Sequence, residues 1–561
     1  MIPRSRLPQA RHSPGWPLLA ILLAGIIILG VASFTLAGPL TGSGSDEEAP
    51  SRYVEAVVGV PARVNPLFAY RNDVDRDIAS LVFSGLTRLG PNGEILPDLA
   101  ESWQVSPDGH TYTFHLRPGV YWQTGVLFTA ADVLFTYGLL ADPNLQGDPD
   151  QAALWRQVKC TAPDDATVQC ELPQPFAPFL SFTTIGILPK YILQVTSPAS
   201  LLDHPFNQAP VGTGPFQLVQ LDQRRAILRT NTSYHLGQPQ LNEIELRFYP
   251  DTSIAAAALA RKEVQGLLLG PSASQTDFDT ITSSGGLKAY TANRTIYTIL
   301  YLNNSAPPFN DPLVRSAVAR AVDIDALIGK LLGGRAVRAD SPIVPGTWAF
   351  NPELHPYSYD IEAARALLDG AGWLLPKDSQ LQLRRRDGTA LRISLMTDRD
   401  PLRTALAEEV ARQLAKIGIV ATIKVQDPTD LVRDFLIPRQ YQAAIFGWDP
   451  GPDPDPYPAW HSSQISDNGL NLAAYLNEEA DELLEEARRT TDLDRRQALY
   501  YTFQQIFHDD VPSLLLYYPV YTYFVSNQIE SVKLGTLFYT SSRFNNVYEW
   551  SLRKSKSIRG P

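Results

Sequence analysis

One informative stretch of the chain reads LPDLAESW at residues 96–103 and SPDGHTYTFHLRPGV at residues 106–120. In its second part, Tyr112, Phe114 and Leu116 alternate with polar residues. This alternation is typical of a strand with one buried face. The stretch therefore indicates that this part of the chain carries a sheet.

Strand patterns on both sides of this stretch are joined to helix patterns. A β-rich apolar run covers residues 53–60, and apolar residues then recur at helical spacing from Val74 to Leu86. Strands are also predicted around residues 244–248 and over residues 419–425. N-capped or glycine-terminated helices are predicted over residues 130–140, 252–262, 361–369, 401–417, 477–490 and 493–507. Mixed acidic and basic residues on the last two helices indicate solvated sides. The order indicates an α/β protein with more than one lobe.

One long helix is predicted in the second half of the chain. Asp311 is a good N-cap and Pro312 suits the first helical position, while Gly333 and Gly334 provide a stop after Leu332. The sequence therefore predicts a single helix from Asp311 to Leu332.

Length and composition limit the classes of protein that the chain can belong to. The 561 residues exceed what one hydrophobic core supports, so two or three lobes are expected. A net charge of −11 without a dense basic face disfavours a nucleic-acid binder. We expect a folded, multi-lobed protein that does not bind nucleic acid.

The two cysteines, Cys160 and Cys170, flank a turn centred on Asp165. A hairpin would bring their sulfurs opposite each other, and an oxidising compartment would then favour a disulfide between them. The alternative is two unbridged cysteines on separate strand faces. Two thiols alone do not predict a metal site.

The N-terminus has the pattern of an export signal. Basic residues 1–15 precede an uncharged, largely aliphatic span at residues 16–40, and residues 41–52 form a Gly/Ser-rich and acidic linker. A helix over residues 16–40 is long enough to cross a membrane and would place the rest of the chain outside the cytoplasm. A cleaved signal peptide, with a cleavage site near Ala37, is the alternative.

Catalytic motifs are absent from the sequence. There is no His-Glu-x-x-His pair for zinc, no Gly-x-Ser-x-Gly elbow and no phosphate-binding P-loop. We therefore expect a protein that is not an enzyme and that has no catalytic residues, metal or cofactor.

An ordered series of blocks resembles family 5 of the extracellular solute-binding proteins, the peptide and nickel receptors of ABC importers. The resemblance spans residues 53–550. Besides the opening stretch, it rests on VNPL (64–67), LVFSGL (81–86), FTAADV (128–133), PVGTGPF (210–216), FNDPLVR (309–315), ARAVD (319–323) and AARALLDGAGW (363–373). Where the family usually has an aromatic-His-Asp-Gly turn, this chain has YWQTG at residues 121–125. We interpret that turn as structural.

The resemblance implies a two-lobed, periplasmic-binding-protein-like clamshell of the large type, with an extra inserted domain, after the N-terminal transmembrane helix. Lobe I would comprise residues 53–95, 206–296 and 516–553, the extra domain residues 96–205, and lobe II residues 297–515. It also implies a monomer that delivers a small peptide to a permease pair with its ATPase. Alternatives are a membrane-anchored peptide sensor or chaperone, and a receptor for an oligosaccharide, an opine or a nickel chelate.

A peptide cleft needs a carboxylate for the ligand's amine and often an arginine for its carboxylate, because unpaired buried charges are costly. In similar receptors an aspartate after a Gly-Trp pair binds the amine, and the loop at residues 447–457 fills that place. Its candidates are Asp453 first, then Asp449 and Asp455, with Trp448 and Tyr457 as aromatic walls; the family's aspartate spacing fits none of them cleanly. Arg399 and Arg403 are the carboxylate candidates. The alternatives are a rigid proline-rich loop with solvated acids and two surface arginines.

Overall fold

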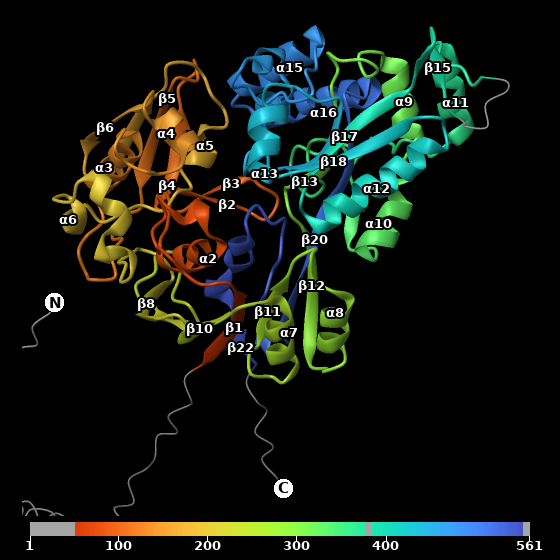
Figure 1. Ribbon diagram of the computed structural model, residues 1–561. Coiled ribbons are helices and arrows are strands. Elements are labelled where there is room, and N and C mark those ends of the chain that lie inside the picture. The colour runs from red at the N-terminus through yellow and green to blue at the C-terminus, as the bar shows by residue number, and fades with distance from the viewer. Residues whose placement is uncertain (1–50, 377–382, 554–561) are drawn as a thin grey trace, which may run out of the picture. The chain divides into compact units, whose positions relative to one another are not determined.

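The structure, a computed structural model, describes residues 51–376 and 383–553 (Figure 1). The predicted basic terminus, the span at residues 16–40 and most of the linker lie outside the described residues. Within the described ranges, no helix is both long and apolar enough to cross a membrane.

The first half-sheet contains the N-terminal strand of the described chain. Its strands, in spatial order, are β11 (Gly266–Leu269), β1 (Arg52–Val58), β10 (Glu243–Tyr249), β9 (Arg225–Thr230) and β8 (Phe216–Leu221). β1 is parallel to both β10 and β11, whereas β9 and β8 continue antiparallel. The helices α7 (Thr252–Ala260) and α8 (Gln275–Thr282) contribute to one core with Ala56 of β1. Tyr53, on the opposite side of β1, packs in another core with α2 (Asp73–Val82).

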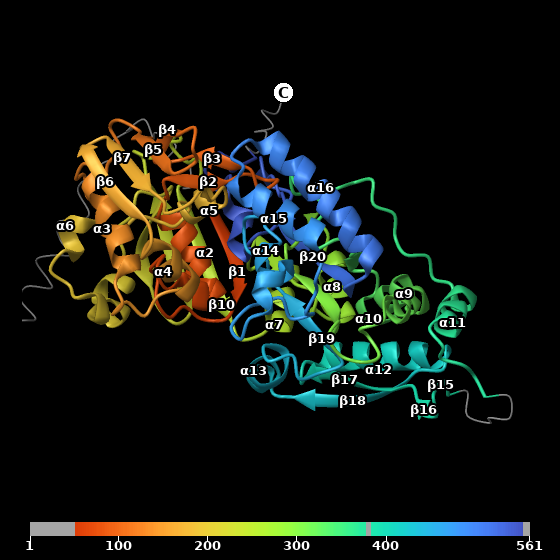
Figure 2. The same ribbon diagram turned by 90° about the horizontal axis from the view of Figure 1, so that it is seen from above.

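The second half-sheet lies between two helical layers. Its strands, in spatial order, are β18 (Val420–Gln426), β17 (Arg392–Asp398), β19 (Ala443–Trp448) and β13 (Tyr297–Leu302). Leu300 of β13 packs with α9 (Pro312–Ala321), α10 (Ile324–Leu332), α11 (Ile361–Gly370) and α12 (Pro401–Ala415). Ile299, its neighbour, packs with α15 (Glu478–Arg489) and α16 (Leu493–Asp510). Leu300 and Ile299 pack with different helices because successive residues of a strand point to opposite faces of the sheet. Figure 2 shows α15 and α16, in blue, apart from α10 and α12.

The strand β20 (Ser513–Ser526) joins the two half-sheets. Its first part, up to Pro519, pairs with β13 and with β14 (Ala336–Arg338). Its second part pairs with β11 and with β12 (Leu287–Asn293). One continuous strand is therefore shared by both half-sheets.

A separate four-stranded sheet contains most of the stretch at residues 100–116. Its order is β4 (Ala100–Val105), β5 (Thr111–Leu116), β7 (Thr167–Glu171) and β6 (Lys159–Asp164), with α3 (Ala130–Ala141) and α4 (Pro149–Trp155) nearby in the chain. The predicted alternation in β5 is confirmed, because Tyr112, Phe114 and Leu116 are buried. They belong to the same core as Tyr53 and α2, so this sheet packs against the first half-sheet.

The prediction of a single helix from Asp311 to Leu332 is wrong. Val322 has an extended backbone, with φ −95° and ψ 111°, and ends α9. Asp323 then caps α10 by accepting a hydrogen bond from the Ala326 amide. A second aspartate cap inside the pattern explains the break. Gly333 ends α10 in the left-handed conformation, at φ 58°.

Cys160 and Cys170 lie directly opposite each other in the β6–β7 hairpin and are joined by a disulfide. The bridge closes a loop with a sequence separation of 10 residues. Because closing such a loop restricts the unfolded chain, replacing both cysteines by serine should lower the free energy of unfolding by roughly 2–3 kcal/mol. Urea unfolding of both proteins measures this loss, and reduced wild type should match the variant. Equal stability of variant and oxidised wild type would contradict the expectation.

Candidate ligand-binding cavity

A cavity of about 600 Å³ opens between segments that are distant in the chain. Most of its wall is formed by residues within 66–89, 148–151, 176–186, 448–458 and 539–548, and the rest by Asp98, Pro215, Tyr234, Leu470 and Arg488. Its volume is within the range of small-ligand sites. The charged residues that line it are Asp98, Asp148, Asp150, Asp449, Asp453, Asp455, Arg76, Arg88 and Arg488. The cavity is thus built to meet a ligand that carries charge.

The proline-rich loop after β19 forms one wall of the cavity. Trp448, Asp449, Asp453 and Asp455 line it, whereas Tyr457 begins the short helix α14 (Tyr457–Trp460). The prolines at 450, 452, 454 and 456 fix the backbone and remove amide donors. The carboxylates of this loop are therefore held on a stiff support.

Asp453 is already paired within the protein. Its two carboxylate oxygens accept hydrogen bonds from Arg496 of α16, Oδ2 from Nη1 at 2.9 Å and Oδ1 from Nη2 at 2.5 Å. Burial raises the pKa of Asp453, and the Arg496 guanidinium opposes that rise. A carboxylate that is neutralised on both oxygens has little remaining capacity for a ligand's ammonium group.

Asp455 is also engaged. Its Oδ2 accepts from Arg488 Nε at 2.7 Å, and its Oδ1 accepts from the Tyr457 amide at 3.1 Å. The Arg488 guanidinium lies over the Tyr457 ring, 3.9 Å from its centroid. Tyr457 thus contacts the cavity wall through Arg488.

Asp449 is the most accessible carboxylate of the loop. Its side chain is 47% exposed, and the nearest basic group, Arg294 Nη2, lies 3.9 Å from Oδ2. Its Oδ1 accepts from the Gly451 amide at 3.0 Å, which fixes the direction of the side chain. Of the three aspartates suggested by the sequence, Asp449 is the one that the described residues leave least neutralised.

The two arginines suggested for the carboxylate end are not among the residues that line the cavity. Arg399 is exposed, and Arg403 binds Asp398 through Nε at 2.9 Å and Nη2 at 2.7 Å. The positive charge at the wall comes instead from Arg76, Arg88 and Arg488. Sequence reasoning missed these three, although Arg88 follows the LVFSGL block by only two residues.

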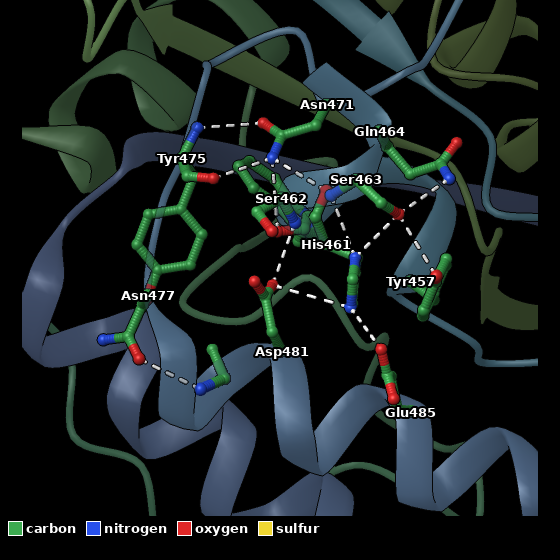
Figure 3. A network of polar contacts seen from close by, with 12 residues as sticks. Tyr457, His461, Ser462, Ser463, Gln464, Asn471, Tyr475, Asn477, Asp481 and Glu485 are labelled. Atoms are coloured by element: carbon green, nitrogen blue, oxygen red, sulfur yellow. Dashed lines mark hydrogen bonds and ion pairs between the residues drawn. The ribbon is translucent and has the colours of Figure 1, made fainter. Parts of the chain in front are cut away.

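A polar network around His461 contacts Tyr457, at the end of the proline-rich loop (Figure 3). The His461 ring stacks on Tyr457 at 4.0 Å between centroids, and its Nδ1 accepts from the Ser463 amide at 3.0 Å. His461 Nε2 faces Glu485 of α15 at 3.4 Å. Because Nδ1 accepts an N–H, Nε2 is the nitrogen that carries the ring proton, but Nε2 makes no hydrogen bond within the described residues. The network fixes the ring of Tyr457 against α15.

Groups of three or more histidine, cysteine, aspartate or glutamate side chains that could hold a metal ion are absent from the described residues. Two α/β half-sheets that share a strand, a further sheet beside them and a charged cavity form the arrangement expected of a large solute-binding receptor.

Comparison with known proteins identifies the family. Residues 94–471 match the family described as bacterial extracellular solute-binding proteins, family 5 middle. The chain therefore belongs to family 5 of the bacterial extracellular solute-binding proteins and has their α/β periplasmic-binding-protein-like fold.

Three relatives illustrate the range of this family. The dipeptide-binding protein of Escherichia coli (strain K12) is 30% identical over 450 residues, which are 75% of this chain and 81% of that protein. The oligopeptide-binding protein AppA from Bacillus subtilis, solved with a nonapeptide, is 28% identical with a TM-score of 0.67, covering 90% of this chain and all of its own (100%). NikZ from Campylobacter jejuni, solved with Ni(L-His), is 27% identical with a TM-score of 0.69, covering 90% and 99%.

Proposed function

We propose that the protein is the extracytoplasmic substrate-binding receptor of an ABC importer and that it binds peptides in the cavity described above. Membership of the family supports this function, as do relatives named for dipeptide and oligopeptide binding. A permease pair and its ATPase would receive the ligand, and the protein would release it chemically unchanged. The receptor would act as a monomer.

The observation that carries the peptide proposal is the pairing of charges at the cavity wall. Asp449 is accessible and weakly compensated, whereas Asp453 and Asp455 are each bound to an arginine. A zwitterionic peptide needs an acid for its amine and a base for its carboxylate, because each buried charge requires a partner. We therefore place the amine at Asp449, with Asp453 and Asp455 as the alternatives, and Trp448 beside it.

The N-terminal segment completes the proposal. The span at residues 16–40 would anchor the receptor to the outer side of the cytoplasmic membrane, and the linker at residues 41–52 would connect it to the folded body. The cavity would then lie between lobe I with the extra domain, on one side, and lobe II at residues 297–515, on the other. A cleaved signal would instead release the same body.

Asp449→Asn should weaken binding of a short peptide by about tenfold to a hundredfold, since a charge-assisted hydrogen bond contributes roughly 1.5–3 kcal/mol. Calorimetry on the purified protein measures this change. N-acetylation of the peptide should weaken binding to the wild type by a similar factor and should cause little further loss in the variant. Asp467→Asn, on an exposed turn away from the cavity wall, is the matched control and should bind as the wild type does.

If the wild type binds free and N-acetylated peptides equally well, the amine anchor is refuted. If it binds no peptide at all, the peptide proposal itself fails. Native mass spectrometry of the protein purified from its host would then identify the solute that occupies the cavity.

A further inference from the structure

Arg488 lies where separate parts of the chain meet at the cavity. It belongs to the last turn of α15 and lines the cavity wall. Its guanidinium lies over the ring of Phe176, 5.4 Å from the centroid, and its backbone carbonyl accepts from the Ala177 amide at 2.6 Å. Arg488 therefore connects α15, the proline-rich loop and the segment that follows β7.

The orientation of the Arg488 guanidinium is fixed on several sides. Asp455 holds Nε at 2.7 Å, and the rings of Tyr457 and Phe176 lie over the group at 3.9 and 5.4 Å. Tyr457 is itself fixed by its stack on His461. A planar guanidinium that is positioned in this way loses little freedom when it binds a further partner.

The terminal nitrogens of Arg488 remain available. Among the described residues, neither Nη1 nor Nη2 has a hydrogen-bond partner, and the side chain is 25% exposed. Arg76, by contrast, bonds Asp73 at 3.2 Å and lies over the Tyr539 ring at 4.4 Å. Arg88 lines the cavity but has no hydrogen-bonded acid among the described residues to orient it. Arg488 is thus the lining arginine that is both oriented and unsaturated.

We propose that Arg488 binds the carboxylate of the ligand through its two terminal nitrogens and that Asp455 is the positioning residue that holds it. This inference rests on the proposed peptide function and assigns the ligand class: peptides with a free C-terminal carboxylate. The planar guanidinium matches a carboxylate in a two-bond geometry, which lysine cannot reproduce.

The test compares one peptide as its free acid and as its C-terminal amide, using calorimetry on the purified full chain. The wild type should bind the acid about tenfold to a hundredfold more tightly than the amide. Arg488→Gln should bind both forms equally, and Arg488→Lys should keep only part of the preference. Arg489→Gln, the adjacent exposed residue of α15, is the matched control and should keep the full preference. Asp455→Asn should reduce the preference without abolishing it.

Three results would overturn the inference: equal binding of acid and amide by the wild type, an undiminished preference in both Arg488 variants, or loss of the preference in Arg88→Gln with Arg488→Gln unaffected. The amine test on Asp449 is independent of all three. Sensitivity to N-acetylation without sensitivity to amidation would leave the peptide function intact and refute Arg488. Absence of any peptide binding by the wild type would refute both.

Discussion

Arg543→Met should lower the free energy of unfolding by about 3–5 kcal/mol, because the change leaves buried carboxylates without their cation. Arg543 is 2% exposed and donates from Nε to Glu55 at 2.7 Å and from Nη2 to Asp77 at 2.6 Å. Glu55 lies on β1 and Asp77 on α2, so the arginine ties the C-terminal segment to the first half-sheet. Urea unfolding measures the loss.

The loss should depend on pH in a defined direction. Burial raises the pKa of Asp77, against the opposing effect of Arg543, so the folded protein binds a proton there more readily than the unfolded chain does. Removing Arg543 strengthens this effect. The free energy of unfolding of the variant should therefore be closest to that of the wild type at low pH. The deficit should grow as pH rises through the raised pKa of Asp77.

Two further variants control the experiment. Arg553→Ala removes an exposed pair with Glu530, whose side chains are 59% and 44% exposed, and should change stability by less than about 1 kcal/mol. Adding Glu55→Gln and Asp77→Asn to Arg543→Met should restore part of the stability, because the uncompensated charges are removed. A deficit no larger than that of Arg553→Ala would contradict the assignment.

Gly212→Ala should destabilise the protein by about 3 kcal/mol or more, since overpacking against a backbone atom cannot be relieved by a side-chain rotation. A Cβ at this position would overlap the carbonyl oxygen of Val82 at the end of α2. The requirement for glycine in the PVGTGPF block thus comes from close approach of two backbones. Thermal and urea unfolding measure the effect.

Gly329→Ala is the matched control for this substitution. Gly329 is exposed in α10, and a Cβ there would meet nothing within 4 Å. Because alanine favours a helix over glycine by about 1 kcal/mol, this variant should be as stable as the wild type or more stable. A Gly212→Ala protein as stable as the Gly329→Ala protein would show that α2 yields to the new methyl group.

Features set by local chemistry could be predicted from the sequence. Asp251, Asp311 and Asp360 cap their helices, as expected for an aspartate directly before a helical pattern, because its side chain can accept a hydrogen bond from a free amide of the first turn. The sequence also suggested that Cys160 and Cys170 face each other, although the turn is not symmetric: a register shift between Thr161 and Asp164 brings Cys160 opposite Cys170. The break after Val322 was not predicted, because the apolar pattern continues across it. Only the cap at Asp323 indicates that a new helix starts there.

The candidate site was less predictable, because the ion-pair partners of its charged side chains lie far away in the sequence. Residues 448–453 and Asp455 of the loop suggested by the sequence line the cavity, but sequence reasoning did not reveal the partners of its acids. Arg488 and Arg496 lie on helices whose mixed charges are typical of solvated faces, yet Arg496 is 5% exposed and neutralises Asp453. No signal near Asp453 reveals a partner 43 residues away.

The shared strand β20 has a consequence for cooperativity. Its first part completes the second half-sheet and its second part completes the first, so neither half possesses all of its own strands. Losing β20 would expose unpaired edges in both halves at once. We therefore expect the two halves to unfold together, and we expect a chain cut within β20 to destabilise both halves.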